Sequence, residues 1–314
     1  MKTNIVLNFY SNKAVIFDLI NISDDFLINI LKDWKCHIYL ICKRKKIYLE
    51  NISTNDLGVQ VINLYTLNDE HEKQRYSKEI FFDINVKGFE NGFFIVDFEA
   101  EKDCKIRDFV FYNQLYTIPN DPVGSSIKEN IITDLEVAYI GQAYGRNADR
   151  TIDYRLIKHE KVQKIAIDIL NKGSNEEILI IGINVDTNDM TTLRSDLNSR
   201  EKIRKNKLIE IATAAQERIS EGQTITIFEA SVIKLFKPIL NKEYKETFPS
   251  QDFTSYGEIY KTKFNHISLI IDTLPVHARV FSPNMLERKY LFHTVHSLAT
   301  NEEKKSLFDF LMDG

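Results

Sequence analysis

A nearly unbroken run of aliphatic residues near the middle of the chain, from Glu177 to Val185, limits the fold more than any other feature. The run is far shorter than the roughly 18 apolar residues that a membrane-spanning helix needs. It is rich in isoleucine, which favours a strand over a helix at this length. A strand that is apolar on both faces must be covered on both faces, so the sequence predicts a buried strand here.

The composition is that of an ordinary globular protein. A chain of 314 residues is long enough for two domains or three small ones. Glycine (11) and proline (6) are both scarce, which argues against repetitive fibres and long disordered linkers. The formal net charge is −4, so any contact with nucleic acid must come from a local basic patch.

The cysteines and the apolar segments point to a reducing compartment. Cys36, Cys42 and Cys104 form no Cys-x-x-Cys pair, and the first two lie in apolar surroundings that are typical of buried free thiols. The sequence shows no candidate membrane helix and no signal-peptide core near Met1. We therefore expect a cytoplasmic protein that does not enter the membrane.

The first region, residues 1–115, is predicted to be a β-rich accessory domain. Two strands at 5–10 and 14–18 are predicted to form a hairpin around Ser11-Asn12-Lys13, and a short helix is expected at 26–34. Further strand-like runs lie at 37–42, 47–49, 59–64, 80–86 and 93–98. The basic cluster at 43–46 is most simply a solvent-exposed turn.

The rest of the chain is predicted to be a central α/β module at 116–250 and a C-terminal part at 251–314, which gives an α+β protein overall. The strongest turn signal, at 119–126, lies near the first boundary. The expected elements are a strand at 137–141, helices at 155–171, 200–220 and 224–240, strands at 267–272 and 278–281, and a final helix at 302–312.

Four pieces of the central module stand in an order that suggests a catalytic site. A strand ends on Tyr-Ile-Gly-Gln at 139–142, and the next helix opens with Arg155 and carries His159 on the same face. Glu229 lies in a later helix, and Asn241 follows that helix. Together these pieces resemble the GIY-YIG nuclease superfamily. In that family a Tyr-Ile-Gly strand precedes a helix with arginine and often histidine, and a metal-binding glutamate and an asparagine follow.

The resemblance implies a DNA endonuclease with one Mg²⁺ or Mn²⁺ ion. Glu229 would bind the ion through oxygen contacts, with water completing the shell. Arg155 offers planar donors to phosphate oxygens, and His159 would act as a general base or orient one. Tyr139 would lie at the site and help to place or deprotonate the attacking water. Asn241 would support the site through hydrogen bonds.

The chain also departs from the family pattern. The family has a Gly-Ile-Tyr strand about ten residues before the Tyr-Ile-Gly strand, and the segment 125–132 contains no tyrosine. Tyr116 would fill this place only through a longer hairpin. A polar insertion at 187–222 is the most basic part of the chain, and its helix places three cations on one face: Arg200, Arg204 and Lys207. These residues are candidates for DNA phosphate contacts, or for an ordinary solvated helix face.

Three functions are compatible with this sequence. The first is a metal-dependent DNA endonuclease, by analogy one that serves restriction or anti-phage defence. The second is a catalytically inactive module of the same kind that binds nucleic acid or a protein partner as a subunit of a larger complex. For either function, a protein partner or a homo-oligomer is compatible with the sequence. The third is a different hydrolase with a site around His277, His293 and His296. Each residue of the proposed site also has a purely structural role as its alternative, so the joint pattern carries the interpretation.

Overall fold

A computed structural model of the chain consists mostly of β-strands. It describes residues 4–19, 35–80, 84–90, 93–101, 104–111, 134–143, 156, 163–165, 167–168, 171, 175–194, 219–249, 259–260, 264, 266–276 and 278–298. Within these residues, only one α-helix has both of its ends described. No helix in this described part of the chain is long and apolar enough to cross a membrane.

The strands are distributed along the whole described chain. Their bounds are β1 Asn4–Asp18, β2 Ile38–Lys45, β3 Tyr48–Thr54, β4 Gln60–Leu67, β5 Lys73–Ile80, β6 Ile84–Glu90, β7 Phe93–Glu101, β8 Cys104–Phe111, β9 Leu135–Gln142, β10 Glu176–Arg194, β11 His266–Asp272, β12 Val280–Ser282, β13 Met285–Lys289 and β14 Leu291–Ser297. The helix α6 spans Glu221–Phe236, and a 3-10 turn, η4, spans Leu274–Val276.

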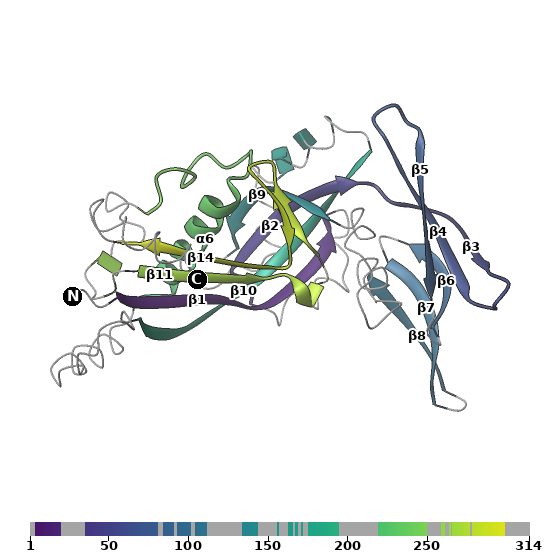
Figure 1. The fold of residues 1–314 in the computed structure, drawn as a ribbon, viewed down its shortest axis with the longest axis horizontal. Helices are drawn as coiled ribbons and strands as arrows, with labels where there is room; N and C mark the ends of the chain where they lie inside the picture. Colours follow the sequence, from purple (N-terminus) through teal and green to yellow (C-terminus); the bar gives the residue numbers. More distant parts are fainter. Residues whose placement is uncertain are drawn as a thin grey trace.

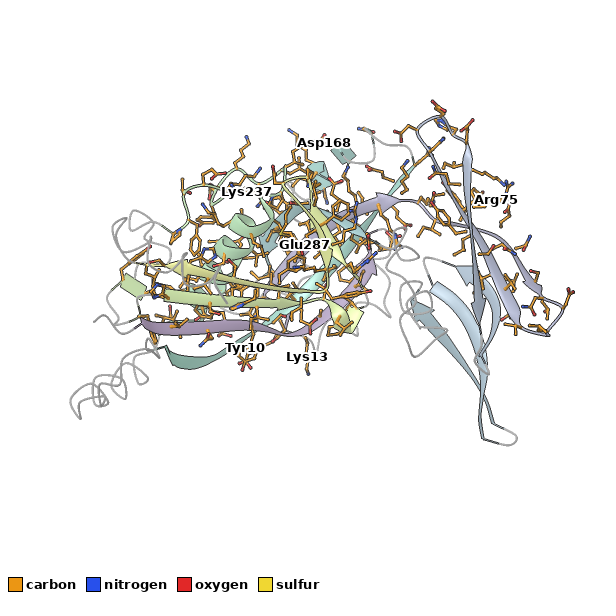
Figure 2. The ribbon with its side chains drawn as sticks, viewed as in Figure 1. Tyr10, Lys13, Arg75, Asp168, Lys237 and Glu287 are labelled. Carbon is orange, nitrogen blue, oxygen red and sulfur yellow. The ribbon has the colours of Figure 1, made fainter. Side chains whose placement is uncertain are left out.

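Eight of these strands form one mixed sheet in the order β13-β12-β9-β2-β10-β1-β11-β14 (Figure 1). The pairs β1–β11 and β9–β12 are parallel, and the other neighbours are antiparallel. The predicted buried strand is confirmed as β10, which lies between β1 and β2. The centre of the sheet therefore joins strands that are far apart in the sequence.

The alternation of side chains along the central strands produces two separate cores. In β10, Leu179, Ile181 and Ile183 belong to a large cluster that also contains the buried face of α6. Ile178 and Ile180 belong to a second cluster on the opposite face, together with Leu156 and Ile165. Both faces of the strand are thus covered, as a continuous aliphatic run requires. The described residues of the helix predicted at 155–171 are helical: 156, 163–165, 167–168 and 171.

The helix α6 is defined by its apolar face and by a sharp stop. Ile225, Phe228 and Val232 are buried at helical spacing against the large cluster. The helix ends where Lys237 adopts a left-handed conformation (φ 45°, ψ 53°) and its N–H donates to the carbonyl of Ile233 at 2.8 Å. Pro238 follows and cannot continue the helix. This stop turns the chain back toward β9.

Between β2 and β9 the chain leaves the sheet and builds two three-stranded antiparallel sheets, β3-β4-β5 and β6-β7-β8. They form an arm that lies to one side of the eight-stranded sheet (Figure 1). In β4, Ile62, Leu64 and Thr66 are buried, and the residues between them are half-buried. This period of two is typical of a sheet with one covered face.

Just before β9, where the chain rejoins the large sheet after the arm, a buried cluster of ion pairs joins Asp134 to two arginines. Asp134, just before β9, accepts from Nε and Nη2 of Arg279 at 2.7 and 3.1 Å and pairs with Arg288 at 3.1 Å. The N–H of Leu135 donates to the carbonyl of Arg279 at 2.9 Å. Removal of one partner would leave a buried charge without compensation, which typically destabilises a protein by about 3–5 kcal/mol.

The structure corrects the predicted fold class. A balanced α+β protein with a separate β-rich accessory domain was expected, whereas the described residues form a mostly β structure. The eight-stranded sheet takes strands from all three predicted ranges, 1–115, 116–250 and 251–314. The helices predicted at 26–34 and 302–312 lie outside the described residues, as does the one predicted at 200–220 except for residues 219 and 220, which are not helical.

Two local predictions also change. The hairpin expected around Ser11 is a single strand, β1, that pairs with β10 along its length. Irregularities between Asn8 and Tyr10 and between Ser11 and Lys13 absorb the polar residues that suggested a turn. The basic cluster at 43–46 mostly continues β2 instead of forming a turn, and Arg44 is buried against Glu177 at 2.6 Å. The prediction of buried free thiols is confirmed for Cys36 and Cys42.

We expect the protein to lose stability in mild acid because of the environment of His296. Its ring packs edge-on against Phe248, with centroids 5.1 Å apart, and its Nε2 has no hydrogen-bond partner within the described structure. Burial, with a smaller contribution from the charge of Lys234, lowers the pKa of His296 to about 4. As pH falls below about 6.5, the unfolded chain therefore takes up a proton that the folded chain does not bind, and stability is lost.

Replacing His296→Phe should remove this loss. Between pH 7 and pH 5, wild-type protein should lose about 2 kcal/mol more unfolding free energy than the variant. Urea denaturation at both pH values measures the difference. An identical pH dependence in the two proteins would show that His296 does not resist protonation.

Candidate active site

The strand that carries Tyr-Ile-Gly pairs with a strand from the beginning of the chain. In the antiparallel register of β2 and β9, Tyr39 lies opposite Gly141 and Ile41 lies opposite Tyr139. The segment Tyr-Leu-Ile at 39–41 therefore runs beside Tyr-Ile-Gly at 139–141. The strand next to Tyr-Ile-Gly thus carries a tyrosine, Tyr39, which the whole arm separates from β9 in the sequence.

Tyr39 was not predicted as a site residue, because the first tyrosine was expected only in the short segment before Tyr139. The sequence feature that could have indicated Tyr39 is the Ile38-Tyr39 pair inside the apolar run at 37–42, which has the length of a strand. Tyr116, which was considered as a substitute, lies outside the described residues. An insertion at the turn of a hairpin leaves the strand register intact, so sequence distance is a poor guide to pairing here.

The two tyrosines and the glycine fit together closely. The rings of Tyr39 and Tyr139 have centroids 6.3 Å apart and are tilted by 41°. A Cβ atom at Gly141 would lie 2.6 Å from the Tyr39 hydroxyl oxygen and 3.0 Å from a Tyr139 ring carbon. Only a residue without a side chain fits opposite Tyr39. Both tyrosines are buried, with exposed fractions of 1% and 7%.

Asn241 extends the edge of β9 with its side chain. Its Oδ1 accepts from the N–H of Ile140 at 2.9 Å, and its Nδ2 donates to the carbonyl of Ile140 at 2.8 Å. The N–H of Leu240 donates to the carbonyl of Ala138 at 3.2 Å. The side-chain amide of Asn241 therefore pairs with both backbone polar groups of Ile140, as a neighbouring strand would. This contact is a structural one to the backbone.

Glu229 reaches the end of the same strand from α6. Its Oε2 accepts from Nε2 of Gln142 at 2.8 Å, and that nitrogen also donates to Oγ1 of Thr226 at 3.2 Å. The Thr226 hydroxyl in turn donates to the carbonyl of Gly222 at 2.8 Å. The carboxylate is half-buried beside fully buried apolar residues of α6, including Ile225 and Phe228. A charged group in such surroundings requires a polar partner, and Gln142 is one.

The tyrosine pair and the carboxylate approach β9 from opposite faces of the sheet. Tyr39 and Tyr139 belong to the smaller core, whereas Ile140 and the helix α6 belong to the larger one. Gly141 faces the tyrosines and Gln142 contacts Glu229, so successive residues of one strand serve the two faces. A ligand that contacts both groups must therefore lie around the end of β9.

Of the predicted site residues, Asn241 and Glu229 contact the end of β9 through Ile140 and Gln142, whereas Tyr139 lies on the opposite face of the sheet beside Tyr39. The other predicted site residues, Arg155 and His159, lie outside the described residues, as do the candidate DNA contacts Arg200, Arg204 and Lys207. Within the described residues, no group of three or more His, Cys, Asp and Glu side chains is arranged to hold a metal ion. A single carboxylate with water ligands would not produce such a group.

The histidines near the C-terminus do not form a common site. His293 and His296 lie three residues apart on β14, so their side chains point to opposite faces. His293 Nε2 lies 2.9 Å from the hydroxyl of Ser268, whereas His296 is buried against Phe248. His277 lies outside the described residues. The described geometry therefore gives no support to a hydrolase centred on these histidines.

Comparison of the chain with protein-family models, with curated protein sequences and with solved structures finds no match. The resemblance to the GIY-YIG superfamily therefore stays a prediction from the sequence.

The close packing at Gly141 predicts that a larger residue at this position destabilises the fold. Gly141→Ala should destabilise the protein by about 1–3 kcal/mol, because the new methyl group overlaps Tyr39 in a fully packed core. Thermal denaturation of the two proteins measures this loss. Gly222→Ala is the matched control, because a Cβ there meets nothing within 4 Å.

The double variant Gly141→Ala, Tyr39→Phe tests the contact itself. Removal of the nearest atom, the Tyr39 hydroxyl, should make the combined loss smaller than the sum of the single losses. Simple additivity, or equal effects at Gly141 and Gly222, would show that Tyr39 does not require the glycine.

Proposed function

We propose that this protein is a metal-dependent nuclease that hydrolyses phosphodiester bonds in DNA, with its centre at the shared end of β2, β9 and α6. The observation that supports this most is the register of β2 and β9, which places Tyr39 opposite Gly141 and Ile41 opposite Tyr139. A GIY-YIG-like centre needs two tyrosine-bearing strands side by side, followed by a helix with a glutamate. Here β2 and β9 are the strands, and α6 carries Glu229 close to them.

The chemistry of Glu229 fits one hard divalent ion. A half-buried carboxylate, held through one oxygen by Gln142 and flanked by apolar residues, is a suitable anchor for Mg²⁺ or Mn²⁺ with water ligands. When bound, such an ion supplies charge stabilisation to a phosphate and to its leaving oxygen. Glu229 would hold the ion, and Gln142 keeps that carboxylate at the end of β9.

The other groups would serve the attacking water and the phosphate. A tyrosine hydroxyl from Tyr39 or Tyr139 would place the water or take its proton. Arg155 would contact phosphate oxygens, and His159, one turn later, would assist proton transfer. Asn241 would maintain the strand by holding the backbone of Ile140. Each of these roles is a prediction for mutagenesis.

A second candidate function is a silent module of the same architecture that binds nucleic acid or a protein partner without cutting. The burial of the two tyrosines supports it, because hydroxyl groups with so little exposed surface are not open to substrate in this structure. The separation of the tyrosines and Glu229 onto opposite faces supports it as well.

Substitution of the carboxylate distinguishes the two functions. Glu229→Gln should reduce Mg²⁺- or Mn²⁺-dependent cleavage of plasmid and single-stranded DNA at least 100-fold, because the amide cannot anchor the ion. Agarose gels with each metal and with EDTA measure this loss. Glu246→Gln, an exposed ion-paired glutamate, is the matched control and should cut like wild type. Binding of DNA without cutting by all three proteins would favour the silent module.

The tyrosines give an independent test. Tyr39→Phe or Tyr139→Phe should lower the cleavage rate by about 10²–10⁴-fold, the usual contribution of a positioned acid–base group. Which of the two has the larger effect identifies the hydroxyl that faces the water. Mn²⁺ affinity, measured by calorimetry, should not change. Tyr76→Phe, on the arm, is the control substitution. Full activity in both site variants would exclude a tyrosine from the chemistry.

A further inference from the structure

The hydrogen bonds around Glu229 define the orientation of the neighbouring glutamine amide. The hydroxyl proton of Thr226 is used on the carbonyl of Gly222, at 2.8 Å. Thr226 Oγ1 therefore acts only as an acceptor toward Gln142, at 3.2 Å. The group that faces it must be the NH₂ of the glutamine and not its carbonyl. Both protons of that NH₂ are then assigned, one to Thr226 and one to Glu229.

This arrangement orients the carboxylate. A donor at 2.8 Å from Oε2 fixes the rotation of the Glu229 carboxylate. A side chain that anchors a divalent cation must be held in one orientation. The amide of Gln142 supplies this condition from the end of β9.

We propose that Gln142 is a positioning residue for Glu229, and that Thr226 sets the direction of the Gln142 amide. The proposal rests on the proposed function, because it assumes that Glu229 binds the divalent ion. It assigns a role to Gln142, which the sequence resemblance included only as the end of its Tyr-Ile-Gly-Gln strand, and it adds Thr226. The positioning group belongs to β9 and the carboxylate to α6, so the contact also couples the helix to the Tyr-Ile-Gly strand.

The place of this contact in the fold makes the orientation of Glu229 depend on the position of the end of β9. Thr226 and Glu229 are three residues apart on α6, so both side chains project from the same side of the helix toward β9. Gln142 is the last residue of β9, next to the glycine that accommodates Tyr39. A displacement of the strand end would therefore move the amide relative to the carboxylate and alter the metal site.

The test measures Mn²⁺ affinity of the full chain by isothermal titration calorimetry in the absence of DNA. Gln142→Leu should weaken Mn²⁺ binding about 10–100-fold, the usual effect of removing a group that orients a metal ligand. Thr226→Val should weaken it to a smaller extent, because the amide can then rotate. Thr226→Ser keeps the hydroxyl and should restore wild-type affinity. Ser231→Ala, a buried substitution elsewhere on α6, is the matched control and should change nothing.

The outcomes distinguish this inference from the proposed function. If wild-type protein binds no Mn²⁺, or if Glu229→Gln binds it normally, both the metal site and the positioning role are wrong. If Glu229→Gln loses the ion while Gln142→Leu and Thr226→Val retain wild-type affinity, the nuclease proposal stands and the positioning role is overturned. Circular dichroism establishes whether each variant is folded. If Gln142→Leu does not fold, the Mn²⁺ affinity of Thr226→Val decides whether the positioning role is correct.

Discussion

The pairing of β2 with β9 is the interaction on which the rest of the structure depends. It joins residues near 40 to residues near 140 and places the arm outside the sheet as an insertion at a hairpin turn. The entropy of closing such a long loop grows only slowly with its length, so a well-matched pair of apolar strands can meet that cost. The match includes the close contact of Tyr39 with Gly141, where a Cβ atom would lie 2.6 Å from the Tyr39 hydroxyl oxygen.

The elements that could be predicted from the sequence are those whose pattern is local. The aliphatic run of β10, the strands β2 and β9, and the amphipathic helix α6 follow from spacing and burial, which a short window contains. The polar Ser11-Asn12-Lys13 suggested a turn, but β1 absorbs it as an irregularity because its partner β10 continues past it. The fold class was wrong for a related reason, since strands from all parts of the chain join one sheet.

The candidate site was predicted in part for the same reason. Glu229, Tyr139 and Asn241 were identified from motif residues, and the structure places Glu229 and Asn241 in contact with β9, the strand that carries Tyr139. Tyr39 was not identified and Gln142 was given no role, because both depend on which strand and which helix lie beside Tyr-Ile-Gly. Such information is contained in strand pairing, which a single sequence specifies only weakly. The placement of the tyrosines and the carboxylate on opposite faces of the sheet was equally inaccessible.

The position of the arm in the sequence also has a consequence for how the nascent chain reaches its final form. On the ribosome, β2 emerges well before β9 and β10, the two strands that pair with it. At roughly 5–20 residues per second, it waits for several seconds with both edges open and apolar side chains uncovered. During that interval the hairpins of the arm can already form from neighbouring strands. Protection of β2 by a holding chaperone would therefore matter most at this stage of synthesis.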